Sequence, residues 1–350
     1  MKVKVVHVIP TLDLGGAEVA AVNIAKEAKM KGVSYSILPI TIKDEVLVSK
    51  FKNVCNIIEP KKFLGSFYLG AAFNILRLKP SHLVVSLWKS IIPVLITRFV
   101  KKHKFSFFVH SSVFFSLFDR FFSSVAMKLS DNILADSKSS LRFLNLLGYE
   151  RKAIYFPLML RKIKYQTKES NNFLYIGRIA PIKDLLTAIK LFSKIYEIDN
   201  TLEFHIYGPI SDKLYADEIK NFICQIGLRN NIIFKGEVDN SEIPNILVGY
   251  QYFLCTSKAE GMAITVTEAM QSGTIPIVTN VGEIRYYCKD RHNSFIIANP
   301  EKERELLEGI KESLFVKDLK TEISLNASNA FSEYQTLTES IDSFVNLISK

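Results

Sequence analysis

The chain has 350 residues, 48% of them hydrophobic and 23% charged, which indicates a globular protein and excludes a disordered one. This length is comfortable for two domains. Residues 1–165 carry 26 lysines and arginines against 10 aspartates and glutamates, whereas residues 166–350 carry 19 against 25. Unless this basic excess serves only solubility, it predicts that the first half meets an anionic partner: nucleic acid, a phosphorylated lipid or an anionic membrane surface.

The four cysteines are scattered without a C-x-x-C pair, so we expect free thiols in a reducing compartment and no structural zinc. The N-terminal "MKVKVVHVIP" is a predicted strand and lacks the long apolar run of a signal peptide. The most apolar stretch, residues 82–100, is interrupted by Lys89 and Pro93. It predicts a strand followed by a buried helix rather than a membrane-spanning helix.

Short β-rich runs alternate with helical patterns along the chain, which is typical of doubly wound α/β domains. In the first half we predict strands near residues 3–9, 35–40, 55–58, 83–87, 105–109, 132–135 and 153–156. After a polar, basic linker the pattern restarts with "FLYIGR" (173–178). Further strands are predicted near residues 203–207, 231–234, 251–255, 275–278 and 294–297.

This pattern predicts two Rossmann-like domains with parallel sheets. The first domain comprises residues 1–165, the second residues 166–325, and a polar terminal helix occupies residues 326–350. Two such domains in tandem place a crevice between the carboxyl ends of their strands, where ligands of α/β proteins bind.

Two features of the first domain follow predicted strands. Gly15 and Gly16 separate the first strand from the first helix, where glycines allow close backbone approach to an anion or a sugar hydroxyl. The sequence is not G-x-G-x-x-G, and no acidic residue ends the next strand, so a dinucleotide site is disfavoured. His110 follows the strand at 105–109 and is expected to face the crevice. A lone histidine is nevertheless more often structural.

The second domain carries two charged motifs at predicted strand ends. Arg178 and Lys183 lie on one strand-to-helix loop, where Asp184 can help to start the helix, and two cations there suit a diphosphate without a metal ion. Glu260 precedes a short helix that contains Glu268. The helix start, predicted at Gly261 to Ile264, favours an anion, and the carboxylates can accept hydrogen bonds from sugar and ribose hydroxyls. A surface ion pair and two solvated carboxylates are the alternatives.

Together these motifs resemble the retaining glycosyltransferases of family 4, which have the GT-B fold. "EGMAITVTEA" is similar to the family's E-x7-E motif, and "TNVGEIRYYCKDRHNSFII" resembles its GG-x-PE…NGF segment. "LGGAE", "YIGRIAPIKD", "HIYGP" and "IIFKGEVDNSEI" occur in the family order. The resemblance covers most of residues 1–300 and is specific in the second domain. It also implies that the terminal helix packs back on the first domain.

The resemblance implies metal-independent transfer of a hexose or N-acetylhexosamine from a UDP- or GDP-sugar to an acceptor hydroxyl, with retained anomeric configuration. The leaving diphosphate would act as base, on the face from which it departs. Arg178 and Lys183 match the diphosphate-binding pair, Glu260 and His110 match residues near the transferred sugar, and Glu268 matches the glutamate on the ribose. The other implied donor-binding residues are Gly15, Gly16, Gly208, Gly236, Glu237, Val238, Gly261, Met262, Ala263 and Ile264.

The chain departs from the family pattern at the linker "FPLML" (156–160) and at "GPISD" (208–212), which lacks a second glycine. Neither departure touches the implied catalytic residues Glu260, Arg178, Lys183 and His110. A GT-B nucleotide-sugar epimerase and a non-catalytic, membrane-associated partner of a glycosyltransferase remain as alternatives. The motifs favour the transferase, because inactive copies usually lose the glutamates or the Arg–Lys pair.

The family members that this chain most resembles build bacterial surface polysaccharides such as O-antigen or capsule on a lipid carrier. We therefore expect a lipid-linked saccharide acceptor, an anionic membrane surface and no nucleic acid as partners, and a cytoplasmic protein peripheral to the inner face of the plasma membrane. Residues 105–129 hold eight of the 25 phenylalanines and follow the basic run "RFVKKHK" (98–104). This segment predicts either domain core or an interfacial helix. Its apolar stripe is formed by Phe114, Phe118, Phe121 and Val125, widened by Phe115, Phe122 and Leu129.

Overall fold

The structure is a computed structural model that describes residues 3–12, 16–43, 45–111, 114, 116–158, 161–168, 170–298, 302–332 and 334–349. The chain folds into two compact units. The first comprises Met1–Arg161 and Gln335–Lys350, and the second comprises Lys162–Tyr334. Within the described ranges, no helix combines the length and the hydropathy that a bilayer-spanning segment needs.

The first unit is built on a seven-stranded sheet with the order β3-β2-β1-β4-β5-β6-β7. Every neighbouring pair in this sheet is parallel. Its strands are β1 (Lys4–Leu12), β2 (Ser34–Ile42), β3 (Asn56–Ile57), β4 (His82–Ser86), β5 (Phe105–Val109), β6 (Asn132–Ala135) and β7 (Ala153–Tyr155). Its helices are α1 (Gly16–Met30), α2 (Glu45–Lys52), α3 (Phe67–Leu78), the 3-10 turn η1 (Trp88–Ser90), α4 (Ile91–Thr97), α5 (Leu117–Leu129), α6 (Lys138–Leu146) and α14 (Leu337–Ile348).

Both faces of this sheet are covered. Along β1, Val5 and Ile9 belong to one hydrophobic core, and Val6 and Val8 belong to another. Successive side chains of a strand point to opposite faces, so each core lies on one side of the sheet. Residues of α1, α2 and α14 complete the first core, and residues of α3, α4, α5 and α6 complete the second.

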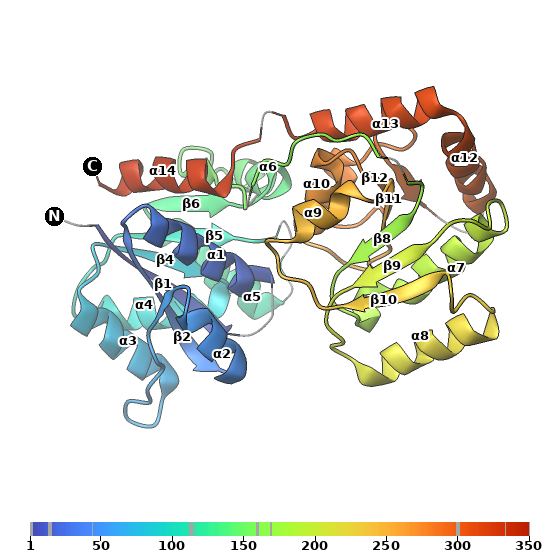
Figure 1. Ribbon diagram of the computed structural model, residues 1–350. Helices are drawn as coiled ribbons and strands as arrows, with labels where there is room; N and C mark the ends of the chain where they lie inside the picture. Colours follow the sequence, from blue (N-terminus) through green and yellow to red (C-terminus); the bar gives the residue numbers. More distant parts are fainter. Residues whose placement is uncertain are drawn as a thin grey trace. The chain divides into compact units, whose positions relative to one another are not determined.

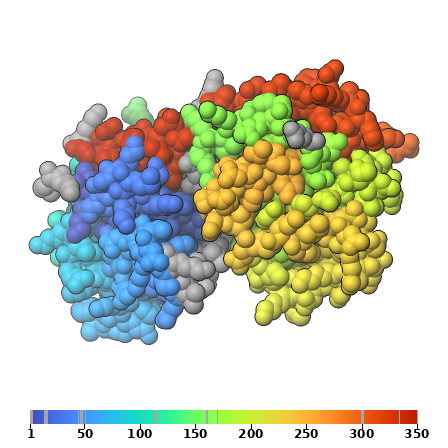
Figure 2. Space-filling model, viewed as in Figure 1, coloured from blue at the N-terminus to red at the C-terminus, as the bar shows by residue number. Residues whose placement is uncertain are grey.

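Helix α14 belongs to the first unit although it follows the whole second unit in sequence (Figure 1). Thr336 and Glu339 form a capping box at its start. Leu337, Ile341 and Phe344 recur at helical spacing and are buried in the core beside α1. Each such apolar side chain contributes about 1.5–3 kcal/mol on burial. In Figure 2 the red atoms of this helix lie against the blue atoms near the N-terminus, where Lys31 pairs with Asp342 at 2.8 Å.

The second unit contains a six-stranded parallel sheet with the order β10-β9-β8-β11-β12-β13. Its strands are β8 (Phe173–Ile176), β9 (Phe204–Tyr207), β10 (Ile232–Gly236), β11 (Tyr252–Cys255), β12 (Ile275–Thr279) and β13 (Phe295–Ile297). Its helices are the 3-10 turn η2 (Pro181–Lys183), α7 (Leu185–Tyr196), α8 (Lys213–Gln225), α9 (Ile243–Val248), α10 (Ile264–Gln271), α11 (Ile284–Tyr287), α12 (Glu303–Phe315) and α13 (Lys317–Asn329).

The prediction of two doubly wound α/β domains is confirmed. Within the described residues, β1 to β13 correspond in order to the predicted strands, with ends that differ by up to three residues. The segment predicted as one terminal helix, 326–350, instead contains the end of α13 and the whole of α14. Residues 326–334 of this segment belong to the second unit, and the chain is again part of the first unit from Gln335. The linker residues 159 and 160 lie outside the described residues.

Candidate functional site

The charged residues predicted in the second unit meet at one edge of its sheet. Strands β8 and β11 are parallel neighbours, so the loops after them emerge side by side. Lys183, at the end of η2, places its Nζ 2.6 Å from Oε1 of Glu260 on the loop after β11. The side chains of Lys183 and Glu260 are 21% and 12% exposed. Two residues that are 77 positions apart thus form one partly buried ion pair.

Ser257 is a member of this site that the sequence analysis did not identify. Its hydroxyl donates a hydrogen bond to Oε1 of Glu260 over 2.6 Å. This oxygen therefore accepts hydrogen bonds from both Lys183 and Ser257. The side chain of Ser257 is buried, and its carbonyl accepts a hydrogen bond from Thr279 over 2.6 Å. The sequence feature that could have indicated this residue is a serine three positions before Glu260. The pKa of the neighbouring Cys255 thiol is raised to about 11, mainly because the thiol is buried and to a lesser extent because of the Glu260 charge.

The loop that carries Arg178 and Lys183 is tied to the strands on both sides. Tyr175 donates its hydroxyl hydrogen to the Arg178 carbonyl over 2.8 Å, and the Thr256 hydroxyl donates to the Asp184 carbonyl over 2.8 Å. Asp184 itself starts α7 with a left-handed backbone, and its side chain does not cap the helix, contrary to our expectation. Among the described residues, none forms an ion pair or hydrogen bond with the Arg178 guanidinium. This loop therefore carries one cation that is paired and one that has no partner among the described residues.

Helix α10 begins at Ile264, later than predicted. Gly261, Met262 and Ala263 precede it, and Ala263 adopts a left-handed conformation with a φ of 50°. The Tyr287 hydroxyl donates to the Met262 carbonyl over 3.0 Å and fixes this turn. Glu268 lies inside the helix and is only 2% exposed, so it is a buried carboxylate rather than a surface one.

The predicted glycines and the residues that follow them lie at neighbouring strand ends. Gly208 follows β9, and its N–H donates to the carbonyl of Gly236, the last residue of β10, over 2.8 Å. A Cβ at position 208 would meet the carbonyl oxygen of Gly177 at 2.0 Å, and the φ of Gly208 is +135°. Only glycine fits there. Glu237 and Val238 continue the chain beyond β10, and Glu237 is exposed.

In the first unit, His110 directly follows β5 as predicted. Its Nδ1 lies 3.1 Å from Oδ2 of Asp136, and its Nε2 lies 3.0 Å from Oγ of Ser86. Neither partner was identified from the sequence. Gly16 is the first residue of α1, whereas Gly15 lies outside the described residues.

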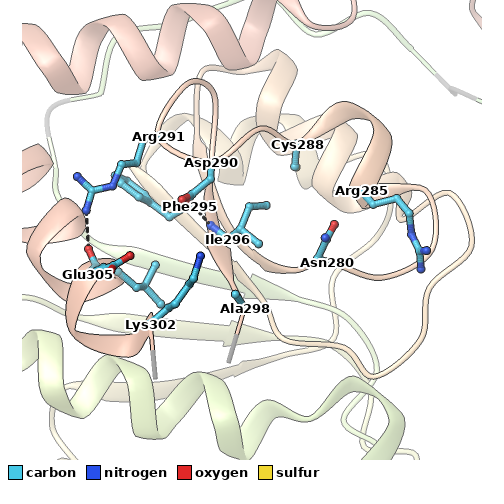
Figure 3. Close-up of a pocket in the computed structure, with 11 residues that line it drawn as sticks. Asn280, Arg285, Cys288, Asp290, Arg291, Phe295, Ile296, Ala298, Lys302 and Glu305 are labelled. Atoms are coloured by element: carbon cyan, nitrogen blue, oxygen red, sulfur yellow. Dashed lines mark hydrogen bonds between the residues drawn. The ribbon is translucent and has the colours of Figure 1, made fainter. Parts of the chain in front are cut away.

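The second unit also holds a hollow of about 330 Å³ beside β13 and α12 (Figure 3). Its charged groups are largely engaged within the protein. Arg291 donates to the Glu305 carbonyl over 2.7 Å, and Asp290 accepts from the Ile296 N–H over 2.8 Å. No residue predicted from the sequence to bind the donor is among the described residues that line it.

Comparison with known proteins places this site in a family context. Residues 160–330 match the family model described as Glycosyl transferases group 1. The second unit is thus similar to group 1 glycosyltransferases over nearly its whole length. The match includes the paired residues Lys183 and Glu260 together with Arg178.

Relatives that are named as glycosyltransferases are similar to parts of the chain. The capsular polysaccharide biosynthesis glycosyltransferase CapH of Staphylococcus aureus is 31% identical over 199 residues, which cover 54% of this chain and 52% of CapH. A GDP-mannose:cellobiosyl-diphosphopolyprenol alpha-mannosyltransferase of Xanthomonas oryzae is 26% identical over 33% of this chain and 30% of its own. A UDP-Gal:alpha-D-GlcNAc-diphosphoundecaprenol alpha-1,3-galactosyltransferase of Escherichia coli is 26% identical over 39% and 35%. The chain thus spans about half or less of the length of these relatives.

Solved structures match over nearly the whole chain. A glycosyltransferase from Rickettsia africae has a TM-score of 0.79 at 17% identity, covering 99% of this chain and 98% of the other. Anabaena HepE, solved in complex with UDP and glucose, has a TM-score of 0.75 at 16% identity, covering 99% and 100%. At such identities the likeness concerns the fold. The fold is GT-B.

Proposed function

We propose that this protein is a retaining glycosyltransferase of family 4 that moves a hexose or N-acetylhexosamine from a UDP- or GDP-sugar to an acceptor hydroxyl. The observation that carries the proposal is the pairing of Glu260 with Lys183 on the loop that also carries Arg178, whose guanidinium has no ion-pair partner among the described residues, within a domain that matches group 1 glycosyltransferases. Its relatives include one protein named for UDP-galactose and another named for GDP-mannose, which supports a nucleoside-diphosphate sugar as the donor class.

When a donor binds, Lys183 and Glu260 of this ion pair would contact different parts of it. A diphosphate that approaches Arg178 competes with Glu260 for the Lys183 ammonium. Glu260 Oε1, still held by Ser257, then has a lone pair available to accept from a hydroxyl of the transferred sugar. Charge that develops on the leaving diphosphate is stabilised by Arg178, Lys183 and the start of α10. These groups act most strongly in the transition state, when the diphosphate charge is greatest.

The proposal is tested by incubating the purified chain with a panel of UDP- and GDP-sugars and measuring nucleotide release and sugar transfer. We expect one donor to release UDP or GDP, with a rate that rises when a saccharide acceptor is added and does not change with EDTA. A GT-B epimerase would interconvert sugars without acceptor-dependent release, and a non-catalytic partner would release nothing. Loss of the rate in EDTA would contradict the metal-independent mechanism.

We further propose that the acceptor is a lipid-linked saccharide in O-antigen or capsule biosynthesis, at the cytoplasmic face of the plasma membrane. Two of the relatives are named for diphosphopolyprenol-linked acceptors, and CapH is named for capsular polysaccharide. Such an acceptor is confined to a membrane, so an enzyme that docks on the bilayer gains access to it.

The surface that supports docking lies on α5 and the segment after α4. Leu117, Phe118 and Phe121 of α5 are 83%, 69% and 63% exposed. Phe99 and Val100, after α4, are 92% and 75% exposed. We call these five residues the apolar surface. Next to it in sequence are the exposed cations Lys101, Lys102 and Lys104 on the one segment, and Arg120 on the other. Exposed apolar side chains with flanking cations suit an anionic lipid interface.

Two phenylalanines of the predicted apolar stripe pack against other aromatic rings of the first unit. Phe122 stacks on Trp88 with ring centroids 5.6 Å apart, and Phe114 packs on Phe143 before the helix begins. These two rings therefore belong to the unit itself rather than to the apolar surface. Phe115 lies outside the described residues.

We expect the Phe118→Ser/Phe121→Ser variant to bind anionic liposomes roughly thirtyfold less than the wild type, because two largely exposed rings no longer enter the interface. Flotation with phosphatidylglycerol vesicles measures this partitioning. Wild-type binding should also weaken in high salt. The matched control is Leu214→Ser/Phe315→Ser, which removes side chains that are 84% and 63% exposed on the second unit. Equal loss in both variants, or no wild-type binding, would exclude the apolar surface as a membrane contact.

A further inference from the structure

The single tryptophan of the chain, Trp88, lies on a turn at the carboxyl edge of the first unit's sheet. It begins η1 directly after Leu87, and Leu87 follows Ser86, the last residue of β4. The turn contacts both β1 and α5. Ligands of α/β domains bind at this edge of a parallel sheet, so Trp88 is placed where a substrate can reach it.

The turn keeps a conformation that costs free energy. Leu87 has a φ of 65° and a ψ of 150°, a combination that residues other than glycine rarely adopt. Ser90, the last residue of η1, is 0% exposed, and its hydroxyl has no hydrogen-bond partner among the described residues. Backbone strain concentrates at functional sites, and a buried hydroxyl without a partner is rare in folded proteins. Both features point to a functional role for this turn.

A row of aromatic rings leads from the apolar surface to this turn. Phe121, a member of the apolar surface, meets Phe122 edge to face with ring centroids 5.3 Å apart. Phe122 stacks on Trp88 with centroids 5.6 Å apart and an interplanar angle of 18°. We call Phe121, Phe122 and Trp88 the aromatic row. Phe122 and Trp88 are half-buried, so each keeps part of its surface open to a ligand.

A cation lies at the end of the aromatic row. The Nζ atom of Lys89 is 5.3 Å from the centre of the Trp88 ring, which is within the range of a cation–π contact. Lys89 is exposed and has no ion-pair partner among the described residues. The contact with the indole restricts a side chain that is otherwise flexible. Less side-chain entropy is therefore lost when an anion binds this ammonium.

We propose that Lys89 and the aromatic row bind the lipid diphosphate of the acceptor, with the ammonium on the diphosphate and the rings along the lipid chain. This inference rests on the proposed function, which supplies a lipid-linked saccharide as the acceptor. A lipid diphosphate carries its anion next to an apolar chain, and the protein presents a cation next to open aromatic rings. Phe121 belongs to the proposed membrane contact, so the lipid chain passes from the bilayer directly onto the row.

The first test measures binding without any sugar transfer. The probe is farnesyl diphosphate, and the tryptophan fluorescence of the full chain reports on Trp88 alone. We expect a saturable change in emission, with a Kd that is about tenfold higher for Lys89→Ala, the scale of losing one charged hydrogen bond. Lys89→Arg, which keeps the cation, should bind the probe nearly as the wild type does. Lys89 is exposed, so the Tm should not change in either variant.

The matched control is Lys62→Ala. It removes another exposed lysine of the first unit whose Nζ lies over an aromatic ring, 5.0 Å from the centre of Phe67. This variant should bind the probe with the wild-type Kd. The proposal is overturned if Lys89→Ala also keeps the wild-type Kd, or if neither fluorescence nor calorimetry detects binding to the wild type. Inorganic diphosphate should bind more weakly than the probe, and equal binding would show that the rings hold no lipid.

Competition separates the lipid diphosphate from the diphosphate of the donor. The proposed function assigns the donor diphosphate to Arg178 and Lys183 in the second unit. UDP and GDP should therefore leave the bound probe in place, and Arg178→Ala should bind the probe as the wild type does. Displacement of the probe by either nucleotide would assign Lys89 to the donor and overturn the proposal.

The second test compares two acceptors that carry the same saccharide, one on a lipid diphosphate and one on an alkyl chain without phosphate. Lys89→Ala should raise KM about tenfold for the first acceptor alone, with kcat unchanged, because the diphosphate contact is made equally in the ground state and the transition state. Equal changes in KM for both acceptors would contradict a contact with the diphosphate. A wild type that binds farnesyl diphosphate through Lys89 but transfers no sugar would refute the proposed function and still support the lipid diphosphate site.

Discussion

We expect the Arg178→Ala variant to lose about 10²-fold or more in kcat/KM for the nucleotide sugar, the scale of removing one donor to a developing anion. Its guanidinium has no ion-pair partner among the described residues, so its removal strands no buried carboxylate. The loss can therefore be assigned to the diphosphate rather than to the fold. Arg178→Lys should recover only part of the rate, because an ammonium lacks the planar fork of a guanidinium.

Lys183→Ala should lower kcat/KM by a similar factor, but two effects contribute to this loss. It removes a cation from the diphosphate and also leaves Glu260 with Ser257 alone. A double-mutant cycle with Glu260→Gln separates the two effects, since the combined loss should be clearly smaller than the product of the single losses. Lys190→Ala on α7 is the charge-matched control, because this lysine is exposed. Near-normal turnover of Arg178→Ala or Lys183→Ala would refute the diphosphate assignment.

The strands and the site loops of the second unit could be predicted because their signals are local. Strands of a parallel sheet covered on both faces are nearly continuous apolar runs, as in "YFLC" of β11. The carboxyl ends of neighbouring parallel strands lie at one edge, so the loops with Lys183 and Glu260 were expected to meet. The start of α10 was placed too early because Ala263, unlike a glycine, gives no sign of its left-handed backbone.

The partners of His110 could not be predicted from the sequence. Ser86 ends β4 and Asp136 follows β6, and only the strand order and register bring them together with His110. Each of them alone is an ordinary polar residue at or near a strand end. The apolar stripe of residues 114–129 is divided between exposed and packed side chains for a related reason. Helical spacing shows which side chains share a face, but the neighbouring Trp88 decides that Phe122 faces inward.

Substitutions of Glu260 and Glu268, the two glutamates of the E-x7-E motif, should have different effects: the first on donor turnover and the second on nucleotide binding. Glu260→Gln keeps the shape of the side chain but loses its charge, and we expect donor turnover to fall about 10²-fold while free UDP or GDP binds as in the wild type. Ser257→Ala should reproduce this pattern with a smaller effect of about tenfold, because it removes one hydrogen bond to the same oxygen. Kinetics and calorimetry on the same preparations provide both measurements.

Glu268→Gln should weaken the free nucleotide itself by about tenfold or more, because the ribose hydroxyls lose a charged acceptor. Glutamine is preferred to alanine here, since Glu268 is buried in α10 and a truncated side chain would leave a cavity. Equal Tm values for the two glutamine variants would show that neither effect comes from unfolding. If Glu268→Gln binds UDP and GDP as tightly as the wild type, the buried carboxylate stabilises α10 instead of the ribose, and the nucleotide must be held by the strand ends near Gly208 and Gly236.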